Sequence, residues 1–270
     1  MDLTLECCSL GFRYGQRKIL EDLSFKVEPG LFYAVLGKNG SGKTTLLHCL
    51  NKILKPTAGA VKVMGRNLVD LSQGEIARNI SFVPQEHMDI FPFRVIDVVI
   101  MGRAPFLGMT QIPGEKERRL AMEALKLLGF EHLAGCNFNR ISGGERQIVI
   151  LAMALVQAGR VMLLDEPTNH LDFHNQYHLL SKIKKLCKTR QISVVASMHD
   201  PNMAMLFADR IIMLKHGRLI AQGGVEQTMT TANLDLLYDT RTAAVSSFNP
   251  GRFFLPESAM TAITGDSNKE

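Results

Sequence analysis

Residues 31–44 of the chain, LFYAVLGKNGSGKT, decide how the rest of the sequence is interpreted. The first part, 31–36, is a continuous apolar run of the kind that forms a buried strand. The second part, 37–44, is rich in glycine, and a helical pattern of apolar residues follows it through about Leu54. We therefore predict a strand, a glycine-rich loop and a helix in direct succession.

The predicted loop fits the spacing G-x-x-x-x-G-K-[ST], which binds phosphate groups through consecutive backbone N–H groups. The start of the following helix adds a positive end that attracts an anion. Lys43 can then reach the β- and γ-phosphates of a nucleotide, and the Thr44 hydroxyl can bind Mg²⁺. A dinucleotide fingerprint is disfavoured because the glycines lack the G-x-G spacing. The nucleotide-binding residues predicted here are Gly37, Lys38, Asn39, Gly40, Ser41, Gly42, Lys43, Thr44 and Thr45.

A second apolar run, 161–164, ends in two carboxylates, Asp165 and Glu166. Ligands of open α/β sheets bind at the carboxyl ends of the strands, where such a pair would lie. We predict that Asp165 holds Mg²⁺ and that Glu166 polarises an attacking water molecule. Alone, the pair is typical of a solvated strand end. Together with the phosphate loop upstream, it indicates nucleotide hydrolysis.

The remaining sequence alternates between strand and helix patterns. Alternating apolar residues between Leu3 and Val27 predict antiparallel β-structure at the N-terminus. Short apolar runs at 80–83 and 192–196 are separated by helical patterns, which indicates a parallel α/β sheet. Residues 86–140 change character, and their helical spacing predicts an all-helical insert. Residues 241–270 are polar, contain Gly and Pro, and give no clear pattern.

The composition is that of an ordinary globular protein. Of 270 residues, 46% are hydrophobic and 21% are charged, which excludes a disordered, collagen-like or coiled-coil chain. The net charge of +5 comes without a dense Lys/Arg run, so we expect no nucleic-acid partner. We expect neither a signal peptide nor a bilayer span, so any membrane role must come through a partner. Five scattered cysteines without a Cys-x-x-Cys pair fit a reducing cytosol.

Two further runs carry a resemblance to a known family. Residues 165–172, DEPTNHLD, and residues 141–147, ISGGERQ, resemble motifs of ABC-transporter ATPase subunits, and the resemblance covers about residues 3–225. In that family the second run is the signature that caps the nucleotide of a partner subunit. The run also fits a helix capping box, and both interpretations hold together because each uses N–H groups at a helix start. The signature residues implied here are Ser142, Gly143, Gly144 and Glu145.

The resemblance also implies roles for single residues. Gln85 matches the glutamine that meets Mg²⁺ and the attacking water, and His199 matches the switch histidine that contacts the γ-phosphate. Asp172 matches the aspartate that crosses the dimer interface. Tyr14 matches the aromatic residue that stacks on adenine. Without the resemblance, His199 is interpreted as a capping residue after a strand and Tyr14 as a core or edge-strand aromatic.

One segment resembles a particular branch of the family. Residues 95–105, VIDVVIMGRAP, are similar to the segment after the glutamine loop in importers of iron-siderophores, haem and cobalamin. In the family this segment docks on the membrane subunit, and Arg94 and Arg103 at its edges suit the polar rim of such a contact. The alternative is an amphipathic helix that covers the core. The chain departs from the usual family pattern at Glu145, Ile148 and Met153.

The fold class implied is α/β, a P-loop NTPase (RecA-like) core with an N-terminal antiparallel β-subdomain and an inserted α-helical subdomain. The core takes residues 1–85 and 141–240, the helical subdomain takes 86–140 with the signature at its end, and 241–270 form a C-terminal extension. The resemblance implies a homodimeric ATPase that uses ATP and Mg²⁺ to energise import of a metal chelate. Its implied partners are integral membrane permease subunits and a substrate-binding protein, at the cytoplasmic face of the membrane.

Two alternatives stay open at this point. One is an ABC-type ATPase that acts on a soluble target, and the other is an ABC ATPase for a different small substrate. A pure nucleotide-binding regulator is disfavoured because Asp165 and Glu166 are both present, and a sensor needs no general base.

Overall fold

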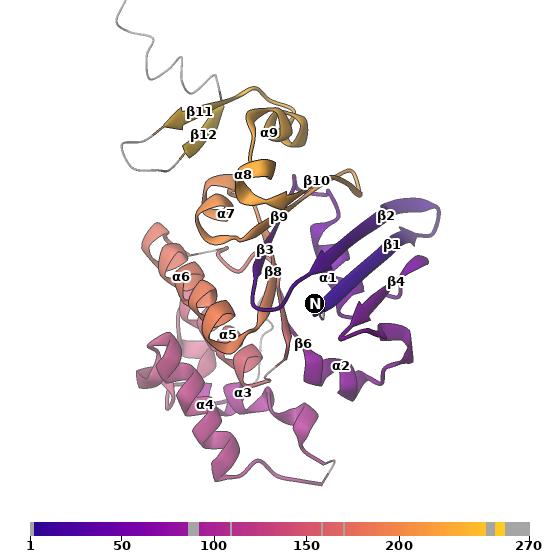
Figure 1. Ribbon diagram of the computed structural model, residues 1–270. Helices are drawn as coiled ribbons and strands as arrows, with labels where there is room; N and C mark the ends of the chain where they lie inside the picture. The colour runs from indigo at the N-terminus through magenta and orange to yellow at the C-terminus, as the bar shows by residue number, and fades with distance from the viewer. Residues whose placement is uncertain are drawn as a thin grey trace, which may run out of the picture.

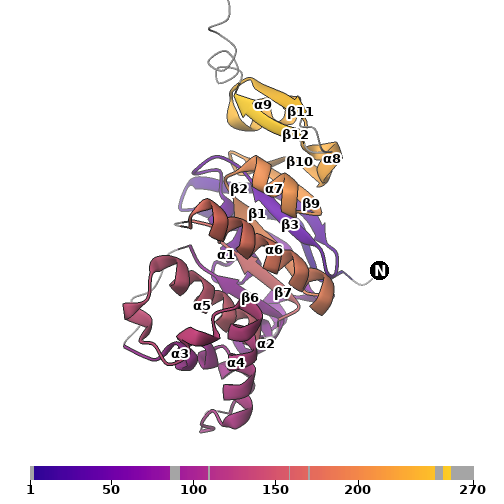
Figure 2. The same cartoon turned by 90° about the vertical axis from the view of Figure 1, so that its left-hand side faces the viewer.

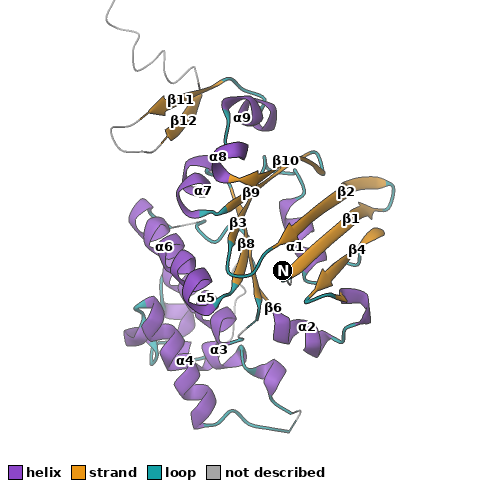
Figure 3. Cartoon of the chain, viewed as in Figure 1, coloured by secondary structure: helices purple, strands orange, loops and turns teal. Residues whose placement is uncertain are grey.

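The centre of the molecule is a six-stranded sheet in the order β10-β9-β3-β8-β7-β6 (Figures 1 and 3). The computed structural model of the chain describes residues 3–85, 92–108, 110–157, 159–169, 171–246 and 252–256. Strands β3, β8, β7 and β6 run parallel, as predicted. Strand β9, which was not predicted, pairs parallel with β3, and β10 pairs antiparallel with β9. The strand bounds are β3 (Phe32–Leu36), β6 (Ile80–Val83), β7 (Val161–Leu164), β8 (Ser193–Met198), β9 (Arg210–Lys215) and β10 (Arg218–Gly224).

The N-terminal part forms a second sheet, of four antiparallel strands in the order β2-β1-β4-β5. Along β2, the inward side chains Leu20, Leu23, Phe25 and Val27 are buried and their neighbours are more exposed. This pattern confirms the predicted antiparallel β-structure. The strand bounds are β1 (Leu5–Tyr14), β2 (Arg17–Val27), β4 (Ala58–Val63) and β5 (Arg66–Asn67).

Helix α1 (Lys43–Leu50) lies between the two sheets (Figure 1). Its Leu46 and Leu50 are fully buried and share a core with apolar side chains of β1, β2 and β4. Tyr33 and Val35 of β3 enter the same core from the parallel sheet. Burial of each such side chain contributes about 1.5–3 kcal/mol. The helix that follows the phosphate loop is therefore held firmly on both sides.

The other face of the parallel sheet is covered by three helices. Phe32, Ala34 and Leu36 of β3 point into this second core, because successive side chains of a strand face opposite ways. Figure 2 shows α6 lying along the covered face. The helix bounds are α5 (Gly143–Val156), α6 (Phe173–Arg190) and α7 (Pro201–Phe207).

Helix α1 is shorter than predicted, because it ends at Leu50 rather than near Leu54. Asn51 is its C-cap, and Lys52 takes a left-handed backbone with φ of 56°. The Lys52 ammonium then donates to the carbonyl of Leu71 at 2.7 Å. This local turn stops the helix although the apolar spacing continues.

The described part of the predicted insert is helical. Helices α3 and α4 pack against each other and against α5. Gly114 is the N-cap of α4, and its N–H donates to Glu117. Gly129 is the C-cap and has a left-handed conformation. Residues 86–91 and 109 lie outside the described residues. The bounds are α3 (Val95–Met101), α4 (Glu115–Leu128) and the 3₁₀ turns η2 (Ala104–Phe106), η3 (Glu131–Leu133) and η4 (Phe138–Arg140).

The segment 95–105 covers the core, so the prediction that Arg103 forms part of an exposed polar rim is wrong. The buried apolar residues of α3 are Val95, Ile96, Val98 and Val99. Gly102 lies so close to α5 that an added Cβ would stand 2.2 Å from the Met153 carbonyl. The neighbouring Arg103 lies against α5 as well. It is 9% exposed, and its guanidinium donates to the carbonyl of Val156 at 2.8 Å.

The C-terminal part forms two helices and a β-hairpin that lie next to α7 and β10 (Figure 1). The extension predicted from residue 241 onward thus includes β-structure that its composition did not indicate. Residues 247–251 and 257–270 lie outside the described residues. The remaining bounds are η1 (Leu68–Asp70), α2 (Gln73–Asn79), α8 (Val225–Thr228), α9 (Thr231–Tyr238), β11 (Thr242–Ser246) and β12 (Arg252–Pro256).

Candidate nucleotide site

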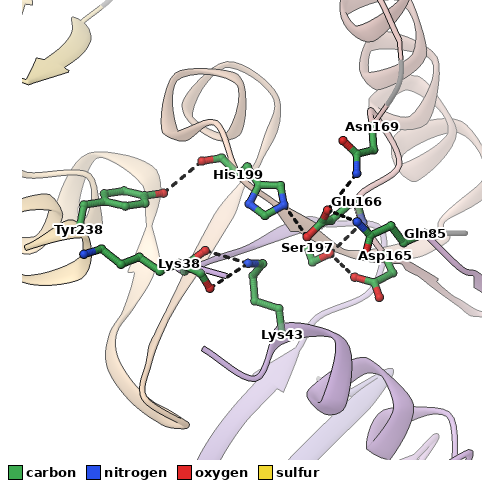
Figure 4. A network of polar contacts seen from close by, with 10 residues as sticks. Lys38, Lys43, Gln85, Asp165, Glu166, Asn169, Ser197, His199 and Tyr238 are labelled. Carbon is green, nitrogen blue, oxygen red and sulfur yellow. Dashed lines mark hydrogen bonds and ion pairs between the residues drawn. The ribbon is translucent and has the colours of Figure 1, made fainter. Parts of the chain in front are cut away.

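The phosphate loop and four further predicted site residues follow the carboxyl ends of four neighbouring parallel strands. Strands β3, β8, β7 and β6 lie side by side in this order. The phosphate loop follows β3, His199 follows β8, Asp165 and Glu166 follow β7, and Gln85 follows β6. Segments far apart in the sequence therefore meet at one edge of the sheet, where open α/β sheets bind ligands (Figure 4).

Lys43 lies at the centre of the phosphate loop. Its ammonium is buried and donates to the backbone carbonyls of Gly37 at 2.8 Å and of Lys38 at 3.2 Å. Burial lowers the pKa of Lys43, and the nearby carboxylates of Glu166 and Asp165 oppose this shift. The loop thus surrounds the Lys43 ammonium, and the carboxylates of Glu166 and Asp165 lie near this ammonium.

Two glycines make this curled loop possible. Gly42 caps α1 with φ of 105°, and a Cβ there would stand 2.8 Å from the side chain of Leu20. At Gly37 a Cβ would stand 2.4 Å from the carbonyl of Leu214. Both positions therefore require glycine for conformation or close approach. The first N–H groups of a helix lack intrahelical partners, so those at the start of α1 can bind phosphate oxygens.

The Glu166 carboxylate is held by three side chains. Its Oε1 lies 2.5 Å from Nε2 of His199. Its Oε2 accepts from Nε2 of Gln85 at 2.6 Å and from Nδ2 of Asn169 at 3.2 Å (Figure 4). The Glu166 backbone is left-handed, with φ of 48°, and its N–H donates to Oγ of Ser197 at 2.8 Å. Strained backbone of this kind persists only where its surroundings fix it.

Asp165 is fixed more deeply than Glu166. It is 1% exposed, and its Oδ1 accepts from Oγ of Ser197 at 2.6 Å. Its backbone N–H donates to the carbonyl of Val83 at 2.9 Å. Ser197 therefore links the two carboxylate residues, because it donates to Asp165 and accepts from the backbone of Glu166.

A cleft of about 480 Å³ opens in front of the loop. Tyr14 stands at its wall, with 55% of the residue exposed and its ring packed edge-on against Phe12 at 4.8 Å between centroids. The ring thus has a free surface, and its stacking on adenine stays a prediction. The lining residues are Tyr14, Arg17, Ile19, Asn39, Gly40, Gly42, Lys43, Thr44, Thr45, Gln85 and Glu166.

The signature residues lie at the start of α5. Ser142 caps the helix, because its Oγ accepts from the N–H of Glu145 at 3.3 Å. The N–H and the hydroxyl of Ser142 both donate to Oε2 of Glu145 at 2.8 Å, which completes a capping box and lowers the pKa of Glu145. Asp172 caps α6 in a similar way, by accepting from the N–H of Asn175 at 2.8 Å. In the described part of the chain, neither cap lines the cleft.

The sequence profile of a family described as ABC transporter matches residues 20–169. That stretch contains the phosphate loop, Gln85, the signature and the carboxylate pair. The chain belongs to the ABC transporter family. It is an ATP-binding cassette of that family, with the α/β fold and the ATPase activity of such cassettes.

Relatives of this ABC cassette include two proteins named for iron and haem. A probable iron chelatin transport ATP-binding protein of Helicobacter pylori is 39% identical over 90% of this chain and 96% of its own length. A hemin import ATP-binding protein, HmuV, of Hydrogenovibrio crunogenus is 37% identical over 84% of this chain and 89% of its own. The similarity thus extends over nearly the whole of each relative.

Solved structures of ABC proteins agree with this fold. A chain described as belonging to a metal-chelate type of ABC transporter, in an inward-facing conformation, superposes with a TM-score of 0.83 at 31% identity, over 95% of this chain and 98% of its own. A dimeric ATP-binding cassette bound to ADP and Pi in a post-hydrolysis state gives a TM-score of 0.71 at 29% identity, over 82% and 98%. Among the described residues of this chain, no helix has both the length and the apolar character needed to cross a membrane.

The donors in this ABC site fit a magnesium ion. Mg²⁺ prefers oxygen ligands and usually binds through one or two carboxylates together with phosphate oxygens and water. The Thr44 hydroxyl, the Asp165 carboxylate and the Gln85 amide oxygen supply such donors at the same sheet edge. In the described ranges, no group of three or more His, Cys, Asp or Glu side chains is placed to hold a metal ion.

Sequence reasoning missed three residues of the ABC site. Ser197 and Asn169 hold the carboxylates, and Arg17 lines the cleft next to Tyr14. Asn169 lies inside the motif at residues 165–172, so its position near Glu166 was a signal that could have identified it. Ser197 gives no such signal, because only the pairing of β7 with β8 brings it to Asp165. His170, quoted in the same motif, lies outside the described residues.

Proposed function

We propose that this ABC ATPase energises the import of a metal chelate, of the iron-siderophore, haem or cobalamin type, through separate membrane subunits. The observation that carries the proposal is a shared feature of its relatives' names. Relatives in Helicobacter pylori, Hydrogenovibrio crunogenus and Halobacterium salinarum are named for iron chelatin transport, hemin import and cobalamin import. All three names specify a cargo that contains a metal ion.

Hydrolysis would proceed in the cleft between the phosphate loop and Glu166. The loop amides and the Lys43 ammonium bind the phosphates and orient the γ-phosphoryl group. Glu166 orients the attacking water and accepts its proton. The side chains of His199, Gln85 and Asn169 hold its carboxylate in position. His199 contacts the same carboxylate and would contact the γ-phosphate.

Thr44, Gln85 and Asp165 are the residues that would hold Mg²⁺. When bound, the ion neutralises charge on the phosphate oxygens. Asp165 keeps its orientation through Ser197, which donates to Oδ1 at 2.6 Å. Gln85 keeps its oxygen free for the ion because its Nε2 faces Glu166.

A second copy of the chain would complete each site. Ser142 and Asp172 are exposed helix caps and do not line the cleft of their own chain. A similar cassette of known structure is dimeric. In a two-fold dimer, the start of α5 from one copy faces the nucleotide held by the other. The residues supplied by the second copy are Ser142, Gly143, Gly144, Glu145 and Asp172.

The membrane subunits would dock on the exposed side of α3 and η2, at the cytoplasmic face of the membrane. Phe93, Met101 and Phe106 are exposed there, around the buried apolar face of α3. The Arg103 guanidinium lies 4.0 Å from the Phe106 ring centroid and holds the ring in place. Exposed apolar groups of this kind are typical of interaction sites. A substrate-binding protein would deliver the chelate on the other side.

Cross-linking tests this docking surface. In a variant with the exposed Cys136 replaced by serine, Phe106→Cys should capture an integral membrane protein in cells that express the whole transport system. Leu236→Cys is the control, because Leu236 is also an exposed apolar residue but lies on α9 at the far end of the molecule (Figure 1). Capture of soluble proteins alone, or equal capture from both positions, would contradict the proposal.

Uptake measurements test the cargo. Cells whose only copy carries Glu166→Gln should fail to accumulate one of three labelled compounds, an iron-siderophore, haem or cobalamin. Unchanged uptake of all three would contradict the metal-chelate assignment and leave the ATPase assignment in place.

A further inference from the structure

The end of helix α9 contacts the segment that carries His199. The Tyr238 hydroxyl donates to the backbone carbonyl of His199 at 3.2 Å (Figure 4). Burial raises the pKa of Tyr238 to about 12, with the nearby Asp200 acting in the same direction, so the phenol keeps its proton. The backbone of His199 is therefore held from outside the cleft, while its side chain contacts Glu166 inside it.

The next residue, Asp239, contacts the phosphate loop. It ends α9 with a left-handed backbone, φ 51°, and its Oδ2 lies 3.0 Å from Nζ of Lys38. Its Oδ1 contacts the ammonium of Lys215, which also donates to the carbonyl of Leu236 at 2.6 Å. The two lysines lower the pKa of Asp239 to about 2. Lys38 is the second residue of the phosphate loop, so α9 is linked to the loop as well.

A third contact comes from the C-terminal hairpin. The amide of Asn202 accepts the N–H of Phe254 at 2.9 Å and donates to the Phe254 carbonyl at 3.2 Å. The Phe254 side chain is buried in the core beneath α7. Asn202 lies in the first turn of α7, three residues after His199. The hairpin thus holds the helix that directly follows the histidine.

We propose that α9 and the hairpin β11–β12 form a brace that positions His199 relative to the phosphate loop and thereby sets the rate of ATP hydrolysis. The brace is defined here as residues 231–246 and 252–256. This inference rests on the proposed place of His199 in the hydrolytic site. Tyr238, Asp239 and Asn202 act as positioning residues, because they hold backbone and loop and do not line the cleft.

The brace should affect turnover more than ATP binding. The nucleotide is bound by loop amides and Lys43, which keep their own contacts when the brace is loosened. The contact between His199 and Glu166 needs a fixed histidine backbone, because a shift of that peptide moves the imidazole away from the carboxylate. Loosening the brace therefore lowers kcat and leaves KM for ATP nearly unchanged.

Tyr238→Phe is the first test, because it removes only the hydroxyl. We expect kcat of the isolated ATPase to fall about two- to tenfold, the worth of one hydrogen bond, with KM for ATP changed less than about twofold. Amide hydrogen exchange in residues 199–203 should become faster in the same variant. Tyr177→Phe is the matched control, since Tyr177 is an exposed tyrosine on α6 outside the brace.

Asp239→Asn is the second test, with Asp70→Asn as its control. Asp70 is exposed on η1, lies outside the brace and does not line the cleft. The pair of Asp239 with Lys38 is exposed, so salt should screen it. We expect the ratio of wild-type to Asp239→Asn kcat to exceed one at low salt and to approach one in about 0.5 M NaCl. The Tyr238→Phe ratio should not change with salt.

Three results would overturn the brace. They are a wild-type kcat in Tyr238→Phe, an equal loss in Tyr177→Phe, and an Asp239→Asn effect that is absent at low salt or matched by Asp70→Asn. Measurement of ATP binding by Lys43→Ala distinguishes failure of the brace proposal from failure of the nucleotide-site assignment. Loss of binding in Lys43→Ala together with a wild-type kcat in Tyr238→Phe rejects the brace and retains the nucleotide site.

Discussion

Replacement of Glu166 by glutamine should stop hydrolysis and leave ATP binding intact. An amide has one acceptor oxygen, which can keep the bonds from Gln85 and Asn169 on the Oε2 side. The amide NH₂ then faces Nε2 of His199, and a neutral imidazole can accept there by changing its tautomer. The pocket therefore keeps its shape, but the group that accepts a proton from water is gone.

The two costs of Glu166→Gln differ greatly in size. At most about one net hydrogen bond is lost, which lowers the free energy of unfolding by about 0.5–1.5 kcal/mol. Loss of a general base lowers turnover by about 10²–10⁴-fold, equivalent to about 3–5 kcal/mol of transition-state stabilisation. Activity should therefore fall far more than stability does.

Steady-state ATPase assays and equilibrium ATP binding measure the two effects separately. Binding persists while hydrolysis stalls, so a sizing column with Mg-ATP should show the variant at twice the 30.0 kDa monomer mass. Adding Ser142→Arg should abolish this shift, because a bulky cation blocks the site offered to the other copy. The matched control is Glu75→Gln, which alters a capping box on α2 and should turn over normally. Wild-type hydrolysis by Glu166→Gln would refute the mechanism.

Three further substitutions test single contacts. Lys43→Ala removes the central ammonium of the loop and should abolish ATP binding, and wild-type affinity in equilibrium dialysis would contradict the loop assignment. Tyr14→Ala should weaken the binding of ATP and of ADP equally, by about 1–3 kcal/mol of stacking free energy. Unchanged dissociation constants for both nucleotides would show that the Tyr14 ring has only a structural role. Ser142 lowers the pKa of Glu145, so the capping carboxylate stabilises the fold above the ordinary value of about 4.3 and loses this effect as pH falls below it. Urea unfolding should therefore show a larger deficit for Glu145→Gln at pH 7 than at pH 3, and an equal deficit at both would be contrary to this account.

The phosphate loop and the carboxylate pair were predictable because each lies in one short stretch of sequence. A strand, a turn and a helix start are local events, and the glycines at 37 and 42 mark the turn directly. The parallel sheet then places Asp165, Gln85 and His199 beside the loop, because strands that share a direction end at one edge. Predicting this part of the site therefore requires no information about side-chain packing.

The remaining site residues depend on contacts that local patterns do not record. Ser197 reaches Asp165 through the register of β7 against β8, and Tyr238 reaches His199 across 39 positions of the chain. The error at Arg103 has a related cause. An apolar run such as 95–101 has the same sequence pattern whether its side chains meet a partner or the core, and only the packing of α3 on α5 distinguishes the two.

The alternation of β3 between two cores also limits how this chain can evolve by gain or loss of residues. Phe32, Ala34 and Leu36 face one core, while Tyr33 and Val35 face the other. Deleting one residue from β3 would exchange the two sets and retract the phosphate loop by about 3.3 Å relative to Asp165. Length differences among homologous chains should therefore gather in segments such as 107–114, between η2 and α4, and avoid β3, β7 and β8. An alignment that placed frequent single-residue gaps inside β3 would show that the two cores are more tolerant than their packing indicates.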